Sequence, residues 1–164
     1  MGSDDLAIVL AWRNHPEVRR HMFHPDEIPL GEHQRWFERE SADPRVHLLV
    51  LEVDGIARGF AKLRDSGQRV ADWGFYVAPD AQRGTGRLLG RETLAHAFIE
   101  LRLHKVCGQV LARNERSLRF HEHQGFAREG VLRQQHFDGQ AYQDVVCFGL
   151  LASEWRQFAE GIQK

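Results

Sequence analysis

The amino-acid sequence predicts an α+β fold in which helices pack on the faces of a β-sheet. Segments with apolar residues at helical spacing are mixed along the chain with short apolar runs typical of strands. No internal repeat or low-complexity linker interrupts the 164 residues, and the hydrophobic fraction of 42% is ordinary for a globular protein. We therefore expect residues 1–164 to form a single domain.

The first helix is predicted near the start of the chain. Asp4 or Asp5 can cap a helix that runs to about Asn14, and Pro16 stops it. The segment His21–Pro29 that follows is expected to be a loop.

A second helix is predicted from Gly31 to about Glu40. His33, Trp36 and Phe37 recur at helical spacing, so they share a face that points inward or into a cleft. For Phe37 we favour packing in the core.

Three strands follow this helix, each bounded by turn-forming residues. They are predicted at His47–Val53, Ile56–Leu63 and Val70–Val77. Asp54-Gly55 is a strong hairpin signal, so the first two strands should be antiparallel. A polar turn is expected at Asp65–Gln68, and Pro79 cannot continue the third strand.

The second half of the chain begins with a glycine-rich loop, Gln82–Arg87, that leads into a helix predicted to end near Leu103. After it we expect a strand, a short helix capped by Asn114 and ended by Gly125, and a hairpin that turns at Asp138-Gly139. The three predicted strands of this half are Val106–Leu111, Ala127–Phe137 and Tyr142–Leu151.

The glycine-rich loop is typical of an anion-binding site. Backbone N–H groups that open a helix point at one spot and carry the positive end of its dipole, so Arg83–Arg87 can bind a pyrophosphate. The P-loop of nucleotide hydrolases is excluded, because Arg87-Leu88 stand where that loop needs lysine and then serine or threonine. A dinucleotide fingerprint, which lacks its third glycine here, or a plain tight turn are the weaker alternatives.

Composition excludes several classes of partner. The formal net charge is −1 and no block of like charge occurs, so we expect no nucleic-acid partner. The longest apolar runs, such as Val46–Val53, are too short to span a membrane, and the chain does not begin like a secretion signal, which predicts a cytoplasmic protein. The spacing of the ten histidines does not suit a zinc site, so no metal is expected.

Three separated motifs give a family resemblance. Gly74–Pro79, Gln82–Gly86, and Asn114-x-x-Ser117 with Gly125-Phe126 beyond it resemble the core of the GCN5-related N-acetyltransferases over about the last two thirds of the chain. The resemblance implies a mixed, mostly antiparallel sheet with a V-shaped splay between two parallel strands. It also implies an enzyme that transfers an acetyl group from acetyl-coenzyme A to an amine.

The resemblance further implies which residues bind the coenzyme. The edge of the strand at Phe75–Val77 would bond the pantetheine arm, and the amide of Val77 would donate to the thioester oxygen. Asn114 would contact the same arm, although plain helix capping also explains it. The implied coenzyme-binding residues are Phe75, Val77, Gln82, Arg83, Gly84, Thr85, Gly86, Arg87, Asn114 and Ser117.

A narrower resemblance covers the first third of the chain. The motifs Trp12–Pro16, Met22-Phe23, Glu32-His33 and Trp36-Phe37 are similar to the acetyltransferases of pseudaminic acid biosynthesis. Those enzymes acetylate the 4-amino group of UDP-4-amino-4,6-dideoxy-N-acetyl-β-L-altrosamine, a nucleotide sugar destined for flagellin or surface glycans. The implied substrate-binding residues are Arg13, at the diphosphate, and Met22, Phe23, His33 and Trp36, around the nucleotide and sugar.

The sequence departs from the family pattern at both proton-handling positions. His121 stands where the family has a tyrosine acid, and it could donate a proton or simply face solvent like His123. Gln109 stands where the narrower group often has a glutamate base, so we expect a water chain ending at Tyr76 or His33 to take the proton. The expected catalytic residues are thus His121, Tyr76 and the amide of Val77.

Three alternatives stay open. The acceptor could be the N-terminal amine of a protein, since ribosomal-protein acetyltransferases share this fold. The chain could instead be a coenzyme A-binding sensor or an inactive partner subunit, and a homodimer is one option for its assembly. Family members place a β-strand before the first helix, whereas only Met1–Ser3 precede it here, so either the chain is truncated or the sheet lacks that edge strand.

Overall fold

The computed structural model describes residues 1–162, and the side chains of residues 1–157. By their contacts, the described residues divide into two compact units. The first comprises Met1–Arg64 and Trp73–Thr93, and the second comprises Asp65–Asp72 and the chain from Leu94 onward.

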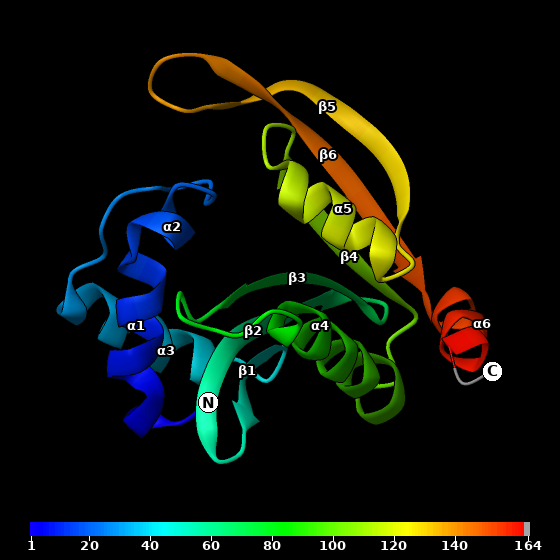
Figure 1. The fold of residues 1–164 in the computed structure, drawn as a ribbon, viewed down its shortest axis with the longest axis horizontal. Coiled ribbons are helices and arrows are strands. Elements are labelled where there is room, and N and C mark those ends of the chain that lie inside the picture. Colours follow the sequence, from blue (N-terminus) through cyan, green and yellow to red (C-terminus); the bar gives the residue numbers. More distant parts are fainter. Residues whose placement is uncertain (163–164) are drawn as a thin grey trace. The chain divides into compact units, whose positions relative to one another are not determined.

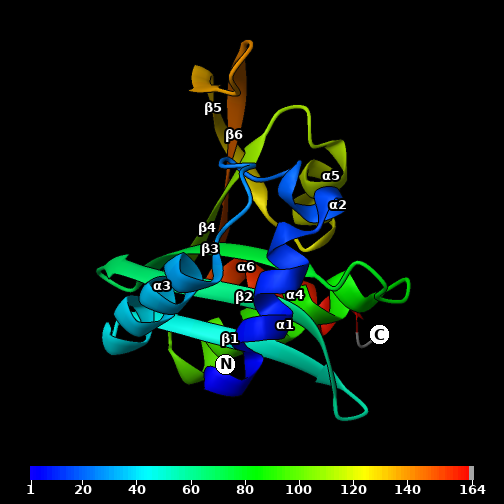
Figure 2. The same cartoon turned by 90° about the vertical axis from the view of Figure 1, so that its left-hand side faces the viewer.

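The first unit holds the amino-terminal helices, the first strands and the helix after the glycine loop. Its elements are η1 (Ser3–Asp5), α1 (Leu6–Asn14), α2 (Pro16–Arg19), α3 (Leu30–Ala42), β1 (Val46–Val53), most of β2 (Ile56–Gly67) and β3 (Val70–Val77), and α4 (Thr85–Ala95). Helices α1 and α3 lie on one face of these strands and α4 on the other (Figures 1 and 2).

The core of this unit joins α1 to β2. Val9 and Trp12 of α1 are buried against Phe60 of β2, and half-buried Trp36 of α3 packs on the same cluster. On the opposite face, a side chain at Gly59 would come within 3.0 Å of Leu89 on α4, so the absence of one lets that helix approach the strand. The neighbouring residues Gly59 and Phe60 of β2 thus face helices on opposite sides of the strands.

The β1–β2 hairpin follows from its turn residues. Asp54 and Gly55 both have positive φ, of 53° and 74°, as a two-residue turn of the type that suits the twist of a hairpin requires. The strands pair antiparallel from Val46 opposite Arg64 to Val53 opposite Ile56. The turn expected at Asp65–Gln68 is misplaced by about two residues, because β2 runs on to Gly67 and the positive φ angles fall on Gly67, Gln68 and Arg69.

The second unit is built on a second hairpin. Its elements are η2 (His96–Glu100), β4 (Lys105–Leu111), α5 (Glu115–His123), β5 (Ala127–Phe137), β6 (Tyr142–Leu151) and α6 (Ala152–Ile162). Strand β6 pairs antiparallel with both β4 and β5, and Val70–Asp72 of β3 pair in parallel with Lys105–Cys107. The hydrogen-bonded strand order is β1-β2-β3-β4-β6-β5, which confirms a mixed, mostly antiparallel sheet.

Most predicted elements are confirmed, and the differences have physical causes. The carboxylate of Asp5 accepts from the backbone N–H of Gly2 at 2.7 Å instead of capping α1. Pro16 ends α1 as predicted, but it also starts α2, because proline suits the first position of a helix. The helix after the glycine loop ends at Glu100 with a π-helical turn, not at Leu103, and α6 was not predicted.

No helix in the described part of the chain is long and apolar enough to cross a membrane.

Candidate coenzyme and acceptor site

The glycine loop adopts a backbone conformation at Gly84 that would be strained if this residue carried a side chain. Gly84 has φ of +97°, in the left-handed region that L-residues avoid. Immediately after it, the backbone N–H and the hydroxyl of Thr85 both donate to the carbonyl of Gln82, at 3.2 and 2.8 Å, and α4 begins. The sequence therefore forms a tight turn that opens directly into a helix of eleven residues.

This turn fits an anion such as the pyrophosphate of coenzyme A. The first N–H groups of α4 have no partner within the helix, and the helix dipole is positive at this end. Gln82, Arg83, Gly84 and Arg87 are exposed, so the loop offers backbone donors and two guanidinium groups to a ligand. Loop and helix start both belong to the first unit.

In the second unit, Asn114 has the capping role that was one of its two expected functions. Its side-chain oxygen accepts from the backbone N–H of Ser117 at 3.1 Å, at the start of α5. The same carboxamide carries an NH₂ group that can donate to a carbonyl of the pantetheine arm. Capping fixes the side chain at the end of β4, so both functions are compatible.

His121 is buried, so the alternative that it faces solvent is wrong. Its exposed fraction is 3%, and its ring stacks on Phe148 with centroids 4.8 Å apart, whereas His123 is exposed. Nδ1 of His121 lies 2.8 Å from the carbonyl of Ser117, which can only accept, so this nitrogen carries a proton. Burial lowers the pKa of His121, and the neutral ring is therefore favoured near neutral pH.

An aromatic cluster in the first unit joins three of the predicted site residues. The ring of His33 stacks on Trp36 at 4.9 Å, Trp36 meets the edge of Phe60 at 6.1 Å, and Phe60 lies 5.1 Å from Tyr76. Phe60 was not among the predicted site residues. The alternation along β2, which places Phe60 on the face of the strand toward α3, is the signal that could have revealed it.

Two buried polar atoms in this cluster lack protein partners. Among the described residues, Nη1 of Arg13 and Nε2 of His33 are buried without a hydrogen-bond partner. Nη2 of Arg13 donates to the carbonyl of His24 at 2.5 Å, which holds the guanidinium in place. Because unsatisfied buried donors and acceptors are costly, a ligand or a water that bonded to these atoms would be stabilised there.

The charges in the cluster interact. Burial is the main cause that lowers the pKa of Arg13 and of His33, and the positive charge of Arg13 lowers that of His33 further. Burial raises the pKa of Tyr76, whose hydroxyl lies 3.4 Å from the carbonyl of Val9. Near neutral pH, His33 is therefore a neutral imidazole able to accept a proton, whereas Tyr76 is a protonated phenol and a poor base.

The other predicted site residues lie in several places. Met22 and Phe23 are half-buried in the loop before α3, as are Phe75 and Val77 in β3, and Phe37, expected in the core, is also only half-buried. The loop is clamped by Asn14, whose carboxamide both donates to and accepts from the backbone of Ile28 at 2.9 Å. Sequence reasoning missed this clamp, because an asparagine near a helix end is more often a cap.

Comparison with known proteins agrees with the predicted family and fold. The family model described as an acetyltransferase (GNAT) domain matches residues 1–127. An uncharacterised N-acetyltransferase of Bacillus subtilis (strain 168), YokL, is 30% identical over 74% of this chain and 71% of its own length. The acetyltransferase PseH of Campylobacter jejuni is 22% identical over 77% of this chain and 79% of its own length.

A solved structure resembles the whole fold. The spermidine N-acetyltransferase of Vibrio cholerae, crystallised with coenzyme A and spermine, superposes with a TM-score of 0.87 at 24% identity, covering 95% of both chains.

The family match and the fold define an enzyme that transfers an acyl group from coenzyme A. The chain belongs to the GNAT acetyltransferase family and is an N-acetyltransferase whose acetyl donor is acetyl-coenzyme A.

Proposed function

We propose that this enzyme acetylates the 4-amino group of a UDP-linked 4-amino-4,6-dideoxy sugar, the reaction of the acetyltransferases of pseudaminic acid biosynthesis that supply flagellin or surface glycans. The observation that carries the proposal is the buried, unpartnered Nη1 of Arg13. A diphosphate oxygen placed there would give the guanidinium the charge-assisted hydrogen bond that it lacks. Nε2 of His33 offers a second polar contact beside it.

The charge of the cluster favours an anionic acceptor over a polyamine. Arg13 carries a positive charge in the first unit, and this charge adds a smaller contribution to burial in lowering the pKa of His33. A polyamine brought to these residues would meet a like charge, whereas a nucleotide diphosphate would neutralise it. The stacked rings of His33 and Trp36 add an apolar surface for a base or sugar.

Each residue of the site has a proposed part in the transfer. The loop Gln82–Arg87 binds the pyrophosphate, Asn114 and Ser117 contact the pantetheine arm with Phe75, and the amide of Val77 donates to the thioester carbonyl. The coenzyme supplies an activated acetyl thioester. Arg13, with Met22, Phe23 and Trp36 around it, holds the acceptor so that its nitrogen can reach that group.

Proton transfers complete the reaction. The amine forms a bond to the acetyl carbon while the bond from carbon to sulfur breaks, and the amine loses one proton as the thiolate gains one. His33, neutral by virtue of its lowered pKa, takes the proton directly or through water that Tyr76 helps to order. His121 is the proposed donor to the thiolate, although its lowered pKa makes the imidazolium scarce at neutral pH.

A thiol-release assay with a panel of amines tests the proposal. UDP-4-amino sugars, a peptide with a free N-terminus and spermidine are offered with acetyl-coenzyme A. We expect turnover with the nucleotide sugar, and thermal stabilisation of the protein by UDP alone. Preferred turnover of the peptide or of spermidine would replace the proposed acceptor, and tight binding of coenzyme A without turnover of any amine would favour a sensor.

The same proposal includes the cellular location and the assembly of the enzyme. Residues 1–164 would act as one domain in the cytoplasm, where acetyl-coenzyme A and nucleotide sugars are available, and a homodimer is the proposed assembly.

A further inference from the structure

Helix α3 is attached through polar side chains. His33 and Glu40 are the residues of this helix that the structure buries, while the aromatic residues between them stay half-exposed. Residues 33, 36 and 40 are separated by three and four positions, so they share one face of the helix. Residues 60, 62 and 64 share one face of β2, because side chains alternate along a strand.

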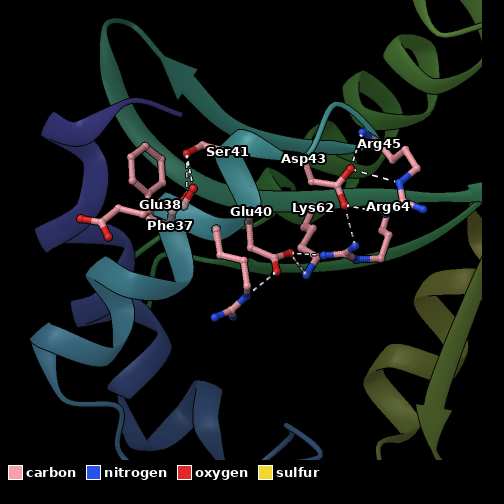
Figure 3. Close-up of polar contacts among 9 residues, drawn as sticks. Phe37, Glu38, Glu40, Ser41, Asp43, Arg45, Lys62 and Arg64 are labelled. Atoms are coloured by element: carbon pink, nitrogen blue, oxygen red, sulfur yellow. Dashed lines mark hydrogen bonds and ion pairs between the residues drawn. The ribbon is translucent and has the colours of Figure 1, made fainter.

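These two faces meet at Glu40. The side chain of Glu40 is only 6% exposed, and its carboxylate accepts from Nζ of Lys62 at 2.7 Å and from Nη2 of Arg64 at 2.6 Å. In Figure 3 dashed lines join the Glu40 carboxylate to Lys62 and Arg64, and Asp43 is joined separately to Arg64 and Arg45. A buried carboxylate loses its hydration, so this position is stable only while the cations remain paired with it.

Glu40 is linked through Lys62 to the aromatic cluster. Nζ of Lys62 lies 6.0 Å from the centre of the Trp36 ring, within reach of a cation–π contact. Trp36 in turn stacks on His33, and the planes of the two rings are inclined by 17° to each other. The order of contacts is therefore Glu40, Lys62, Trp36 and His33, and it ends at the buried Nε2 of His33.

We propose that Glu40 is a positioning residue for the acceptor site: by holding the ammonium of Lys62 at the face of Trp36, it sets the orientation of Trp36 and His33. This inference rests on the proposed function in one respect, that His33 and Trp36 contact the acceptor. Glu40 itself touches neither substrate nor coenzyme.

The test compares Glu40→Gln with Asp43→Asn. Both variants remove a carboxylate that pairs with Arg64, but only Glu40 also binds Lys62. In Glu40→Gln we expect the KM for the acceptor to rise about tenfold, as loss of a partly buried cation–π contact allows, while the KM for acetyl-coenzyme A stays within about twofold. In Asp43→Asn both KM values should stay near those of the parent protein.

A spectroscopic measurement makes the test independent of the acceptor. The ring protons of His33 lie over the Trp36 indole, whose ring current shifts their proton resonances upfield. That signal, identified by its loss in His33→Gln, should move downfield in Glu40→Gln and stay in place in Asp43→Asn. If Glu40→Gln does not fold, Lys62→Gln provides the same two measurements, since it removes the ammonium and leaves Glu40 paired with Arg64.

The possible results distinguish a wrong assignment of the acceptor from a wrong role for Glu40. If the amine panel identifies another acceptor, the proposed substrate is wrong, and the KM comparison is made with the amine that is turned over. If Glu40→Gln only lowers the melting temperature and leaves both the His33 resonance and the acceptor KM unchanged, Glu40 is a stabilising ion pair and the positioning role is overturned. A shifted resonance with an unchanged acceptor KM overturns it equally.

Discussion

The imidazole of His33 lies nearly parallel to the indole of Trp36, with ring centroids 4.9 Å apart and planes inclined by 17°. This contact restrains the imidazole ring of the cluster, which is neutral near pH 7 because burial lowers the pKa of His33. It therefore connects the packing of α3 with the proton transfer that an amine acetyltransferase requires.

Replacing Arg13 tests the acceptor anchor. Arg13→Ala removes the guanidinium whose Nη1 is buried and unpartnered in the described protein. We expect the acceptor KM to rise about a hundredfold, since a charge-assisted hydrogen bond is worth up to about 3 kcal/mol, with the KM for acetyl-coenzyme A unchanged. Steady-state kinetics with each substrate varied in turn measures both constants.

The matched control is Arg20→Ala. Arg20 pairs with Glu17 at 2.7 Å on the exposed side of α2, so its loss should leave both KM values unaltered. An equal rise in acceptor KM for both variants would mean that general positive charge, rather than the Arg13 position, attracts the acceptor.

The pH profile tests His33 as the base. Because burial lowers its pKa below the usual 6.5, kcat/KM should rise with pH along a limb centred below about 6.5. His33→Gln should abolish that limb and reduce kcat about a hundredfold, while the limb of the acceptor amine at higher pH is retained. A profile of the variant that keeps the low-pH limb would assign it to another group.

His121→Phe tests the proposed acid. Phenylalanine preserves stacking on Phe148 but has no proton to donate, so kcat should fall about a hundredfold while the fold, followed by circular dichroism, is kept. Unchanged kcat would assign His121 to packing alone. The same variant should lessen the loss of stability on acidification, because a buried histidine with a lowered pKa destabilises the protein as pH falls below about 6.5.

Gly84→Ala tests the coenzyme loop. Gly84 has φ of +97°, so a side chain there strains the turn whose amides are proposed to bind the pyrophosphate, and the KM for acetyl-coenzyme A should rise about tenfold. Gly139 at the tip of the β5–β6 hairpin has nearly the same φ, +96°, and open space around it. Gly139→Ala should therefore cost similar stability without changing that KM, and a similar KM increase in both variants would contradict the assignment.

The sequence predicted local structure well wherever one residue type dictates the backbone. The hairpin strands β5 and β6 occur with the predicted bounds, because Asp138-Gly139 specifies their turn, and Asn114 caps α5 as expected. The turn after β2 was misplaced, because the positive φ angles that begin at Gly67 continue through Gln68 and Arg69, two residue types that do not usually adopt them.

Contacts between residues far apart in the chain could not be predicted from the sequence. Nothing in the pattern of α3 indicates that Glu40 is buried, since a glutamate is normally exposed and its partners Lys62 and Arg64 come more than twenty residues later. Burial of His121 was likewise hidden, because its partner Phe148 lies on β6. The glycine loop was recognisable because its chemistry resides in consecutive residues.

The most direct test of the account compares kcat/KM for a UDP-4-amino sugar with kcat/KM for the same sugar lacking UDP, in the parent enzyme and in Arg13→Ala. We predict that removing UDP lowers kcat/KM at least about a hundredfold in the parent and much less in the variant, because both changes delete the same contact. Equal rates with and without UDP in the parent enzyme, or faster acetylation of a peptide or of spermidine, would contradict the account.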